Sequence, residues 1–171
     1  MNKLILDAGP LIAVCKFNVA GRLVVDHILD HYEIIVAASV YAEVVIAGAS
    51  YPDAQAARQR IDAGQIVVLP PPADPALEIL LVPYGLGDGE KDSILLTRHS
   101  DLRDATLVVD DHLAYLVSDR LGLRKRFLLD IIVDLASAGK LDEGLAVNMV
   151  HAIRTRYPPA FVEHSLLLLR R

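Results

Sequence analysis

The stretch Lys3-Leu4-Ile5-Leu6-Asp7-Ala8-Gly9-Pro10 sets a short apolar run directly before an aspartate and a turn. Residues 3–6 predict a strand, and a continuous apolar run is typical of a parallel sheet that is covered on both faces. Pro10 fits the first position of a helix that runs towards Ala20, because the N–H that proline lacks has no partner there. The stretch therefore predicts a strand, a turn and a helix, which together open an α/β domain.

Similar apolar runs recur along the chain, and a helical pattern follows each of them. The further strands are expected at residues 34–36, 66–69 and 106–109. Helical patterns cover residues 23–31, 40–46 with Ser39 as the N-cap, 54–63, 90–99, a segment ending at 121, and the chain from about 128 onward. Strands that alternate with helices predict the α/β class, with a three-layer α/β/α fold, a central parallel sheet and a helical C-terminal extension.

The length and composition fit one domain with an aliphatic core. The chain has 171 residues, of which 53% are hydrophobic and 5% aromatic, and this apolar content excludes intrinsic disorder. We expect one unit over residues 1–127 and a helical extension over 128–171 that packs on the same domain. The net charge of −5 argues against an obligate DNA coat protein and against a polybasic membrane binder.

The cysteine content and the hydropathy pattern predict a cytoplasmic protein. The single cysteine, Cys15, excludes an internal disulfide and a thiolate zinc site. Asp7 and Lys16 interrupt the apolar start, where a signal peptide needs a continuous apolar core. No uncharged stretch approaches the ~18–20 residues of a membrane span, so we expect no membrane contact.

Acidic residues stand where the predicted strands end. Asp7 follows the first strand, and Asp110 with Asp111 follows the fourth. Parallel strands direct their carboxyl ends to one edge of the sheet, where α/β domains bind ligands. Three more acids stand near the starts of helices expected at that edge, namely Glu43, Glu90 and Asp92. Four segments that are distant in sequence thus offer carboxylates to one site.

Such a cluster predicts a divalent metal site. Neighbouring carboxylates repel one another, and their pKa values rise unless a cation compensates their charge. Carboxylate oxygens without histidine or cysteine suit Mg²⁺ or Mn²⁺. These ions lower the pKa of bound water and stabilise displacement at phosphorus. The cluster therefore predicts metal-dependent hydrolysis of phosphodiester bonds.

Each acid also has a structural interpretation. Asp7 could cap the following helix, and Glu43 could be a solvated helix residue. The acids at the start of the helix over 90–99 could interact with its dipole. Asp110 and Asp111 are harder to explain in this way, because only one of two adjacent aspartates can cap the next helix.

Taken in order, these motifs resemble the PIN-domain superfamily of ribonucleases. The resemblance covers roughly residues 3–125 and is closest to the prokaryotic branch that includes the toxins of VapBC toxin–antitoxin pairs. The matching motifs are Leu6-Asp7-Ala8-Gly9-Pro10-Leu11-Ile12, Val40 with Glu43, Gly89-Glu90 with Asp92-Ser93-Ile94, and Val109-Asp110-Asp111.

The resemblance implies a PIN-like catalytic domain over residues 1–127 that uses Mg²⁺ or Mn²⁺ to cleave RNA. The catalytic residues that it implies are Asp7, Glu43, Glu90, Asp92 and Asp110, and the metal ligands are the same five with Asp111 in support. The third acid of the family is Asp92 by its spacing before an apolar pair, or Glu90 by its Gly-Glu signature. For the toxin branch, the resemblance also implies an antitoxin protein as partner.

Two departures from the family pattern leave a second hypothesis open. Val109 stands where many relatives have Thr or Ser, and Tyr115 stands where an Arg often follows the paired aspartates. A PIN-like module without catalytic activity, which binds RNA or a protein partner, would have the same fold. A nuclease specific for DNA structures is a third hypothesis, which shares the metal and differs in substrate.

Basic residues are the candidates for the nucleic-acid rim. They are Arg98, Arg120, Arg124 and Lys125. A solvated helix end and loop is the alternative interpretation of the same residues, whereas a rim would neutralise RNA phosphates around the acids. The apolar tail over 166–169 could dock on its own domain, in a homodimer, or against a partner.

Overall fold

A parallel sheet forms the centre of the computed structural model, which describes residues 2–170. The strand order is β5-β4-β1-β6-β7, and each neighbouring pair is parallel. The strands are β1 (Asn2–Leu6), β4 (Tyr32–Ala37), β5 (Ile66–Leu69), β6 (Thr106–Val108) and β7 (Lys125–Arg126). Leu4 pairs with Ile34 on one side and with Thr106 on the other, so β1 lies in the middle of the sheet.

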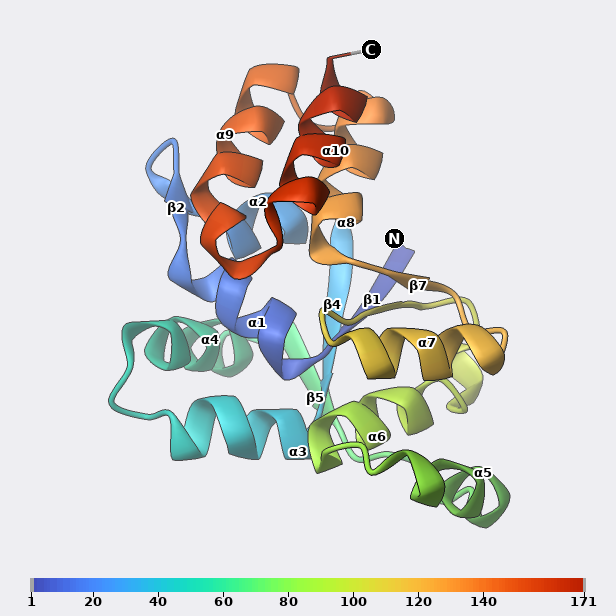
Figure 1. Ribbon diagram of the computed structural model, residues 1–171. Coiled ribbons are helices and arrows are strands. Elements are labelled where there is room, and N and C mark those ends of the chain that lie inside the picture. The colour runs from blue at the N-terminus through green and yellow to red at the C-terminus, as the bar shows by residue number, and fades with distance from the viewer. Residues whose placement is uncertain (1, 171) are drawn as a thin grey trace.

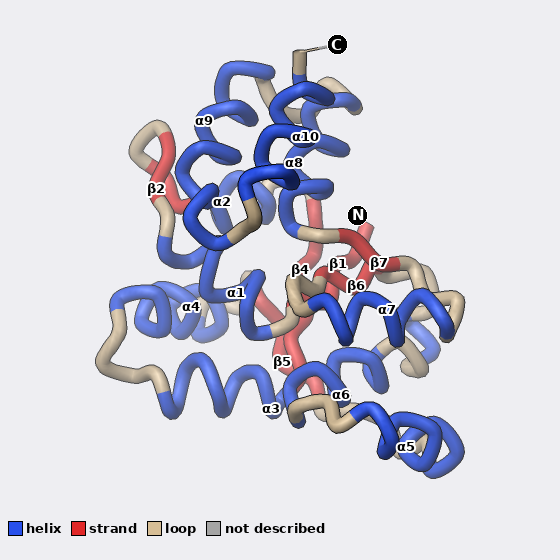
Figure 2. Tube along the Cα trace, in the orientation of Figure 1, coloured by secondary structure: helices blue, strands red, loops and turns tan. Residues whose placement is uncertain are grey.

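Helices cover both faces of this sheet, as Figures 1 and 2 show. Along the chain they are α1 (Ala8–Lys16), α2 (Val24–Leu29), α3 (Ala38–Tyr41), the π-helix η1 (Ala42–Ala47), α4 (Pro52–Asp62), α5 (Pro75–Leu81), η2 (Val82–Tyr84), α6 (Asp88–Leu96), η3 (Ser100–Leu102) and α7 (His112–Arg120). In the view of Figure 1, α1 and α4 lie on one side of the strands, and α6 and α7 lie on the other. The predicted three-layer α/β/α fold is therefore confirmed.

The C-terminal helices pack on one another beside the amino-terminal half of the chain. They are α8 (Leu128–Ser137), α9 (Glu143–Ile153), the short turn η4 (Arg154–Arg156) and α10 (Pro159–Leu169). A single cluster of buried aliphatic side chains extends from Leu4 in β1 to Leu169 in α10. The helical extension therefore shares the hydrophobic core of the sheet, while the division at residue 127 stays an interpretation. None of the helices in residues 2–170 has the length and apolar character to cross a membrane.

Two local predictions were wrong, and two further elements were missed. The helix after Pro10 ends at Lys16, because a hairpin of β2 (Asn18–Val19) and β3 (Arg22–Leu23) follows it, with both turn residues at positive φ. Ser39 does not cap a helix, since α3 starts at Ala38 and the Ser39 hydroxyl donates to the carbonyl of Asp88 instead. The two-residue strand β7 and the helix α5 carry too short an apolar pattern to be recognised, and both were missed.

Candidate active site

The first and fourth predicted strands end side by side at a switch point of the sheet. From β1 the chain continues to β4 and β5 on one side, and it then returns to β6 and β7 on the other. The backbone N–H of Asp7 donates to the carbonyl of Val108 at 3.1 Å, which joins the ends of β1 and β6. In open α/β sheets, such a switch point is where ligands bind.

A cavity of about 270 Å³ opens at this point, and most of the predicted acids line it. Its lining residues are Asp7, Ala8, Gly9, Glu43, Gly87, Gly89, Glu90, Asp110 and Asp111. We call this cavity the acidic pocket. The strand ends, the π-helix η1 and the start of α6 thus contribute five carboxylates to one cavity.

Asp7 is a buried residue of the acidic pocket and has an oxygen without a hydrogen-bond partner. Its side chain is 5% exposed, it makes no capping hydrogen bond to α1, and its Oδ1 atom has no hydrogen-bond partner. Burial, with a smaller contribution from the charges of Glu90, Glu43 and Asp110, raises the pKa of Asp7 to about 6, although a backbone hydrogen bond from Ala8 opposes the rise. A helix-capping role does not explain this residue.

Glycine at position 89 lets α6 approach the carboxylates of the other segments. A Cβ atom there would stand 3.2 Å from Oε2 of Glu43, 3.3 Å from Cγ2 of Val40 and 3.5 Å from Oδ1 of Asp7. Glu43 is exposed and lies in the first turn of the π-helix η1, a helix type that is frequent at functional sites. The free oxygen of Asp7 and the carboxylate of Glu43 therefore face the same point on the backbone.

The two candidates for the third acid occupy different places. Glu90 lines the acidic pocket, and its Oε2 accepts a 2.7 Å hydrogen bond from the backbone N–H of Gly87. Asp92 lies two residues further along α6, about half a helical turn away; it is half-buried and does not line the pocket. Of these two candidates for the third acid, the structure brings only Glu90 to the other carboxylates of the pocket.

Asp110 is held by groups from the C-terminal part of the chain. Its Oδ2 accepts a 2.6 Å hydrogen bond from the Tyr157 hydroxyl, and its Oδ1 accepts one of 3.4 Å from the N–H of Leu128. Burial raises the pKa of Asp110, while these two hydrogen bonds and the nearby charge of Arg156 oppose the rise. The same contact and burial raise the pKa of Tyr157 above its usual range, so its hydroxyl keeps its proton and remains the donor.

Asp111 has a structural role in addition to its place at the pocket. It is exposed, it stands at the N-cap of α7, and its Oδ1 accepts a 2.8 Å hydrogen bond from the N–H of Ala114. A capping aspartate satisfies one of the free N–H groups of the helix start. The adjacent aspartates thus divide their tasks, with Asp111 capping the helix and Asp110 facing inward.

The donor set fits a hard divalent cation, although the side chains do not converge as they stand. In residues 2–170, no three acidic, histidine or cysteine side chains lie close enough together to ligate one ion. Repulsion between carboxylates favours such a separation when no cation is bound. In addition, the N–H of Gly87 holds the carboxylate of Glu90, and the Tyr157 hydroxyl holds that of Asp110. The unpartnered buried oxygen of Asp7 and the all-carboxylate lining suit Mg²⁺ or Mn²⁺.

Three of the four basic residues that were expected at a nucleic-acid rim form ion pairs. The pairs are Arg98 with Asp74 at 3.5 Å, Arg124 with Asp104 at 3.5 Å, and Lys125 with Asp119. Arg120 ends α7 and is exposed. The neighbouring carboxylate of such a pair offsets the positive charge of the arginine or lysine, so the pair attracts a phosphate less strongly than an unpaired side chain would.

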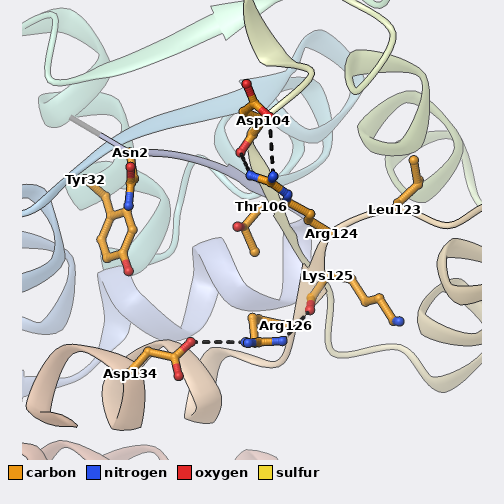
Figure 3. A pocket seen from close by; sticks show the side chains of 9 residues that line it. All are labelled: Asn2, Tyr32, Asp104, Thr106, Leu123, Arg124, Lys125, Arg126 and Asp134. Atoms are coloured by element: carbon orange, nitrogen blue, oxygen red, sulfur yellow. Dashed lines mark hydrogen bonds and ion pairs between the residues drawn. The ribbon is translucent and has the colours of Figure 1, made fainter. Parts of the chain in front are cut away.

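Two of these residues also lie away from the acidic pocket. Arg124 and Lys125 line a cavity of about 540 Å³ together with Asn2 and Tyr32, which begin β1 and β4 (Figure 3). This cavity is therefore at the amino edge of the sheet, whereas the acidic pocket is at the carboxyl edge. The role of the basic residues in binding nucleic acid stays a prediction.

The positions that depart from the family pattern pack within the protein. Val109 is fully buried, and the ring of Tyr115 stacks on that of Phe127 with centroids 4.3 Å apart. The cation near Asp110 comes instead from Arg156, whose Nη2 lies 3.4 Å from the carbonyl oxygen of Gly9. Sequence reasoning missed Arg156 and Tyr157, because no local pattern links residues that follow α9 to the end of β6.

Comparisons with known proteins agree with this arrangement. A family model described as DUF3368, PIN domain, matches residues 3–170. Searches of curated proteins and of solved structures gave no match. PIN domains are generally nucleases and typically use divalent metals. Because the match spans nearly the whole chain, including the C-terminal helices, the chain belongs to the DUF3368 family of PIN domains.

Proposed function

We propose that this protein is an endoribonuclease that uses Mg²⁺ or Mn²⁺ to hydrolyse phosphodiester bonds of single-stranded RNA. The observation that carries the proposal is the acidic pocket, where the buried and unpartnered Oδ1 of Asp7 faces the carboxylate of Glu43 across Gly89. Buried polar atoms nearly always have a partner, and a carboxylate oxygen surrounded by other carboxylates is best satisfied by a cation.

Asp7, Glu43, Glu90 and Asp110 are the residues that would hold the ion, and Asp111 would support them from the start of α7. A bound divalent ion supplies a water of lowered pKa and neutralises charge on the phosphate oxygens. Asp7 contributes a carboxylate that is already desolvated, so its attraction for a cation is weakly screened. Asp110 contributes a carboxylate that accepts a hydrogen bond from the Tyr157 hydroxyl. Asp92 lies outside this set and is proposed only as a distant contributor to its charge.

The test combines metal binding with cleavage. Wild-type protein should bind Mn²⁺ in a calorimeter and should cut a single-stranded RNA oligonucleotide in the presence of Mn²⁺, while Asp7→Asn and Asp110→Asn should lose both properties. Asp62→Asn is the matched control, since Asp62 is an exposed acid at the end of α4 and does not line the acidic pocket. Cleavage by Asp7→Asn at the wild-type rate would overturn the proposal.

The same experiment separates the other two functions. Protein that binds the RNA oligonucleotide but takes up no Mn²⁺ would be a binding module without catalysis. Protein that cuts a single-stranded DNA oligonucleotide faster than the RNA would be a DNA nuclease that uses the same carboxylates. The metal chemistry would be the same for both polymers, so only the substrate comparison distinguishes them.

The toxin role is part of this proposal and has its own test. If the protein is a toxin, induced expression of the wild type should arrest bacterial growth and Asp7→Asn should not. A small neighbouring gene whose product restores growth when it is co-expressed would identify the antitoxin. Size-exclusion chromatography of the purified chain tests the homodimer. Normal growth under induction, with active ribonuclease in the extract, would exclude the toxin role.

A further inference from the structure

A turn between the last two helices reaches the acidic pocket from the C-terminal part of the chain. This turn consists of η4 and Tyr157, and it follows α9 directly. The Tyr157 hydroxyl and the carboxylate of Asp110 are 2.6 Å apart, although 47 residues separate them in sequence. Among the residues that the structure describes, Asp110 is the pocket residue to which this hydroxyl donates a hydrogen bond.

The turn is firmly held at both ends. Ile153, the last residue of α9, is fully buried, and Val162 in the first turns of α10 is buried as well. Pro158 and Pro159 follow Tyr157, and each fixes its own φ angle and restricts the residue before it. Tyr157 is therefore presented to Asp110 by a segment with little conformational freedom.

Arg156 stands beside the same carboxylate with most of its donors free. Its Nη2 donates to the carbonyl of Gly9 at 3.4 Å, and a Cβ atom at Gly9 would stand 3.9 Å from both this Nη2 and Oδ2 of Asp110. Within residues 2–170, no carboxylate lies at ion-pair distance from Arg156, in contrast to Arg98 and Arg124. An exposed guanidinium that is held by a backbone carbonyl keeps N–H groups for an incoming anion.

We propose that Tyr157 is a positioning residue that fixes the carboxylate of Asp110, and that Arg156 binds a phosphate of the nucleic-acid substrate beside it. The inference rests on the proposed function. A phosphate that approaches five carboxylates is repelled unless a cation receives it, and Arg presents a planar set of donors that matches phosphate oxygens. Residues of the C-terminal turn thus complete a pocket whose acids come from the sheet.

The role of Tyr157 is tested by metal binding, without any substrate. Tyr157→Phe removes one hydroxyl and keeps the ring, so the melting temperature should change little. The affinity for Mn²⁺, measured by calorimetry, should fall about tenfold or more, as is usual when the partner of a ligand is lost. Tyr32→Phe is the control, since Tyr32 is half-buried at the opposite edge of the sheet. Unchanged Mn²⁺ affinity in Tyr157→Phe would overturn its positioning role.

The role of Arg156 is tested by two measurements, of which only the cleavage rate should fall. Arg156→Gln removes a positive charge beside the pocket, so Mn²⁺ should bind as tightly as in the wild type or more tightly. The kcat/KM for a short oligouridylate should fall about tenfold or more, because a charge-assisted hydrogen bond to phosphate is lost. Arg156→Lys should recover part of the loss, and Arg154→Gln in the same turn should behave as wild type.

The outcomes distinguish this inference from the proposed function. If the wild type cuts the oligouridylate and Arg156→Gln cuts it equally well, the phosphate role is wrong and the ribonuclease remains. If Arg156→Gln loses Mn²⁺ binding and activity together, Arg156 supports the fold of the pocket and does not bind substrate. If the wild type cuts no nucleic acid, the proposed function fails, and the Mn²⁺ titration of Tyr157→Phe still decides the positioning role.

Discussion

The backbone of Gly89 lies so close to Glu43 that a Cβ atom there would stand 3.2 Å from Oε2 of the glutamate. The same atom would stand 3.3 Å from a methyl group of Val40, which is fully buried and cannot move away easily. The absence of a side chain at position 89 therefore sets how closely α6 and η1 approach. The distance between their carboxylates depends on this contact.

We expect Gly89→Ala to weaken Mn²⁺ binding about tenfold, by displacing a ligand in the way that loss of a supporting contact does. Calorimetric titration with Mn²⁺ measures the change. Gly144→Ala is the matched control, because a Cβ atom there would also meet a carboxylate oxygen, that of Asp142 at 3.1 Å, far from the pocket. Equal Mn²⁺ affinities of Gly89→Ala and wild type would show that the approach of these helices does not shape the metal site.

Asp7→Asn should stabilise the metal-free protein at neutral pH. Folding raises the pKa of Asp7 from 3.8 to about 6, so the unfolded chain loses this proton first and wild-type stability falls as pH rises from about 4 to 6. Above pH 6 the raised pKa of Asp7 lowers the free energy of unfolding of the wild type by about 3 kcal/mol. Asparagine is neutral throughout and avoids this loss.

Denaturant unfolding in EDTA at a series of pH values measures the effect. The stability gain of Asp7→Asn over wild type should be largest near pH 7 and should vanish near pH 4, while Asp62→Asn should follow the wild type. A gain that is the same at both pH values would mean that ionisation of Asp7 is not its cause.

Mn²⁺ should bind more tightly to the wild type as the pH increases from about 5 to 7. Asp7 must lose its proton before it can ligate a cation, and it does so with a pKa of about 6. Competition with one proton weakens binding about tenfold for each pH unit below this pKa. Calorimetry in buffers of different ionisation enthalpy also counts the released proton. A flat affinity across this range would exclude Asp7 as a ligand that binds by losing a proton.

Substitutions of Asp111 separate helix capping from metal binding. Asp111→Ala removes the hydrogen bond to the N–H of Ala114 and should lower the free energy of unfolding by about 1 kcal/mol. Asp111→Asn keeps an acceptor at the N-cap and should be nearly as stable as the wild type. If Asp111 only supports the ligands, both variants should retain most of their Mn²⁺ affinity. Loss of binding in Asp111→Asn with unchanged stability would make Asp111 a ligand in its own right.

The sequence predicted most of the sheet and the acids at its carboxyl edge. The run over 66–69 became β5 with the predicted bounds, and Asp7 and Asp110 follow neighbouring strands. Both results depend on local patterns, because apolar runs form buried strands and parallel strands present their ends together. The alternation of strand and helix was likewise enough to predict the three layers.

The parts that were missed depend on contacts between distant segments. No periodicity at Lys125–Arg126 reveals that two residues extend the sheet beside β6. The choice between Glu90 and Asp92 depended on the direction of each side chain from α6, which spacing alone left open. The contact between Tyr157 and Asp110 arises from the packing of α9 and α10, so only the folded chain reveals it.

The place of β1 in the middle of the sheet has a consequence for protein synthesis. A ribosome releases the chain from its N-terminus, so Asp7 emerges first, while β6, which pairs with β1, emerges about a hundred residues later. Tyr157, the partner of Asp110, follows later still. Contacts of such long range form slowly, and the acidic pocket stays unfinished on a nascent chain until the turn that carries Tyr157 has been translated.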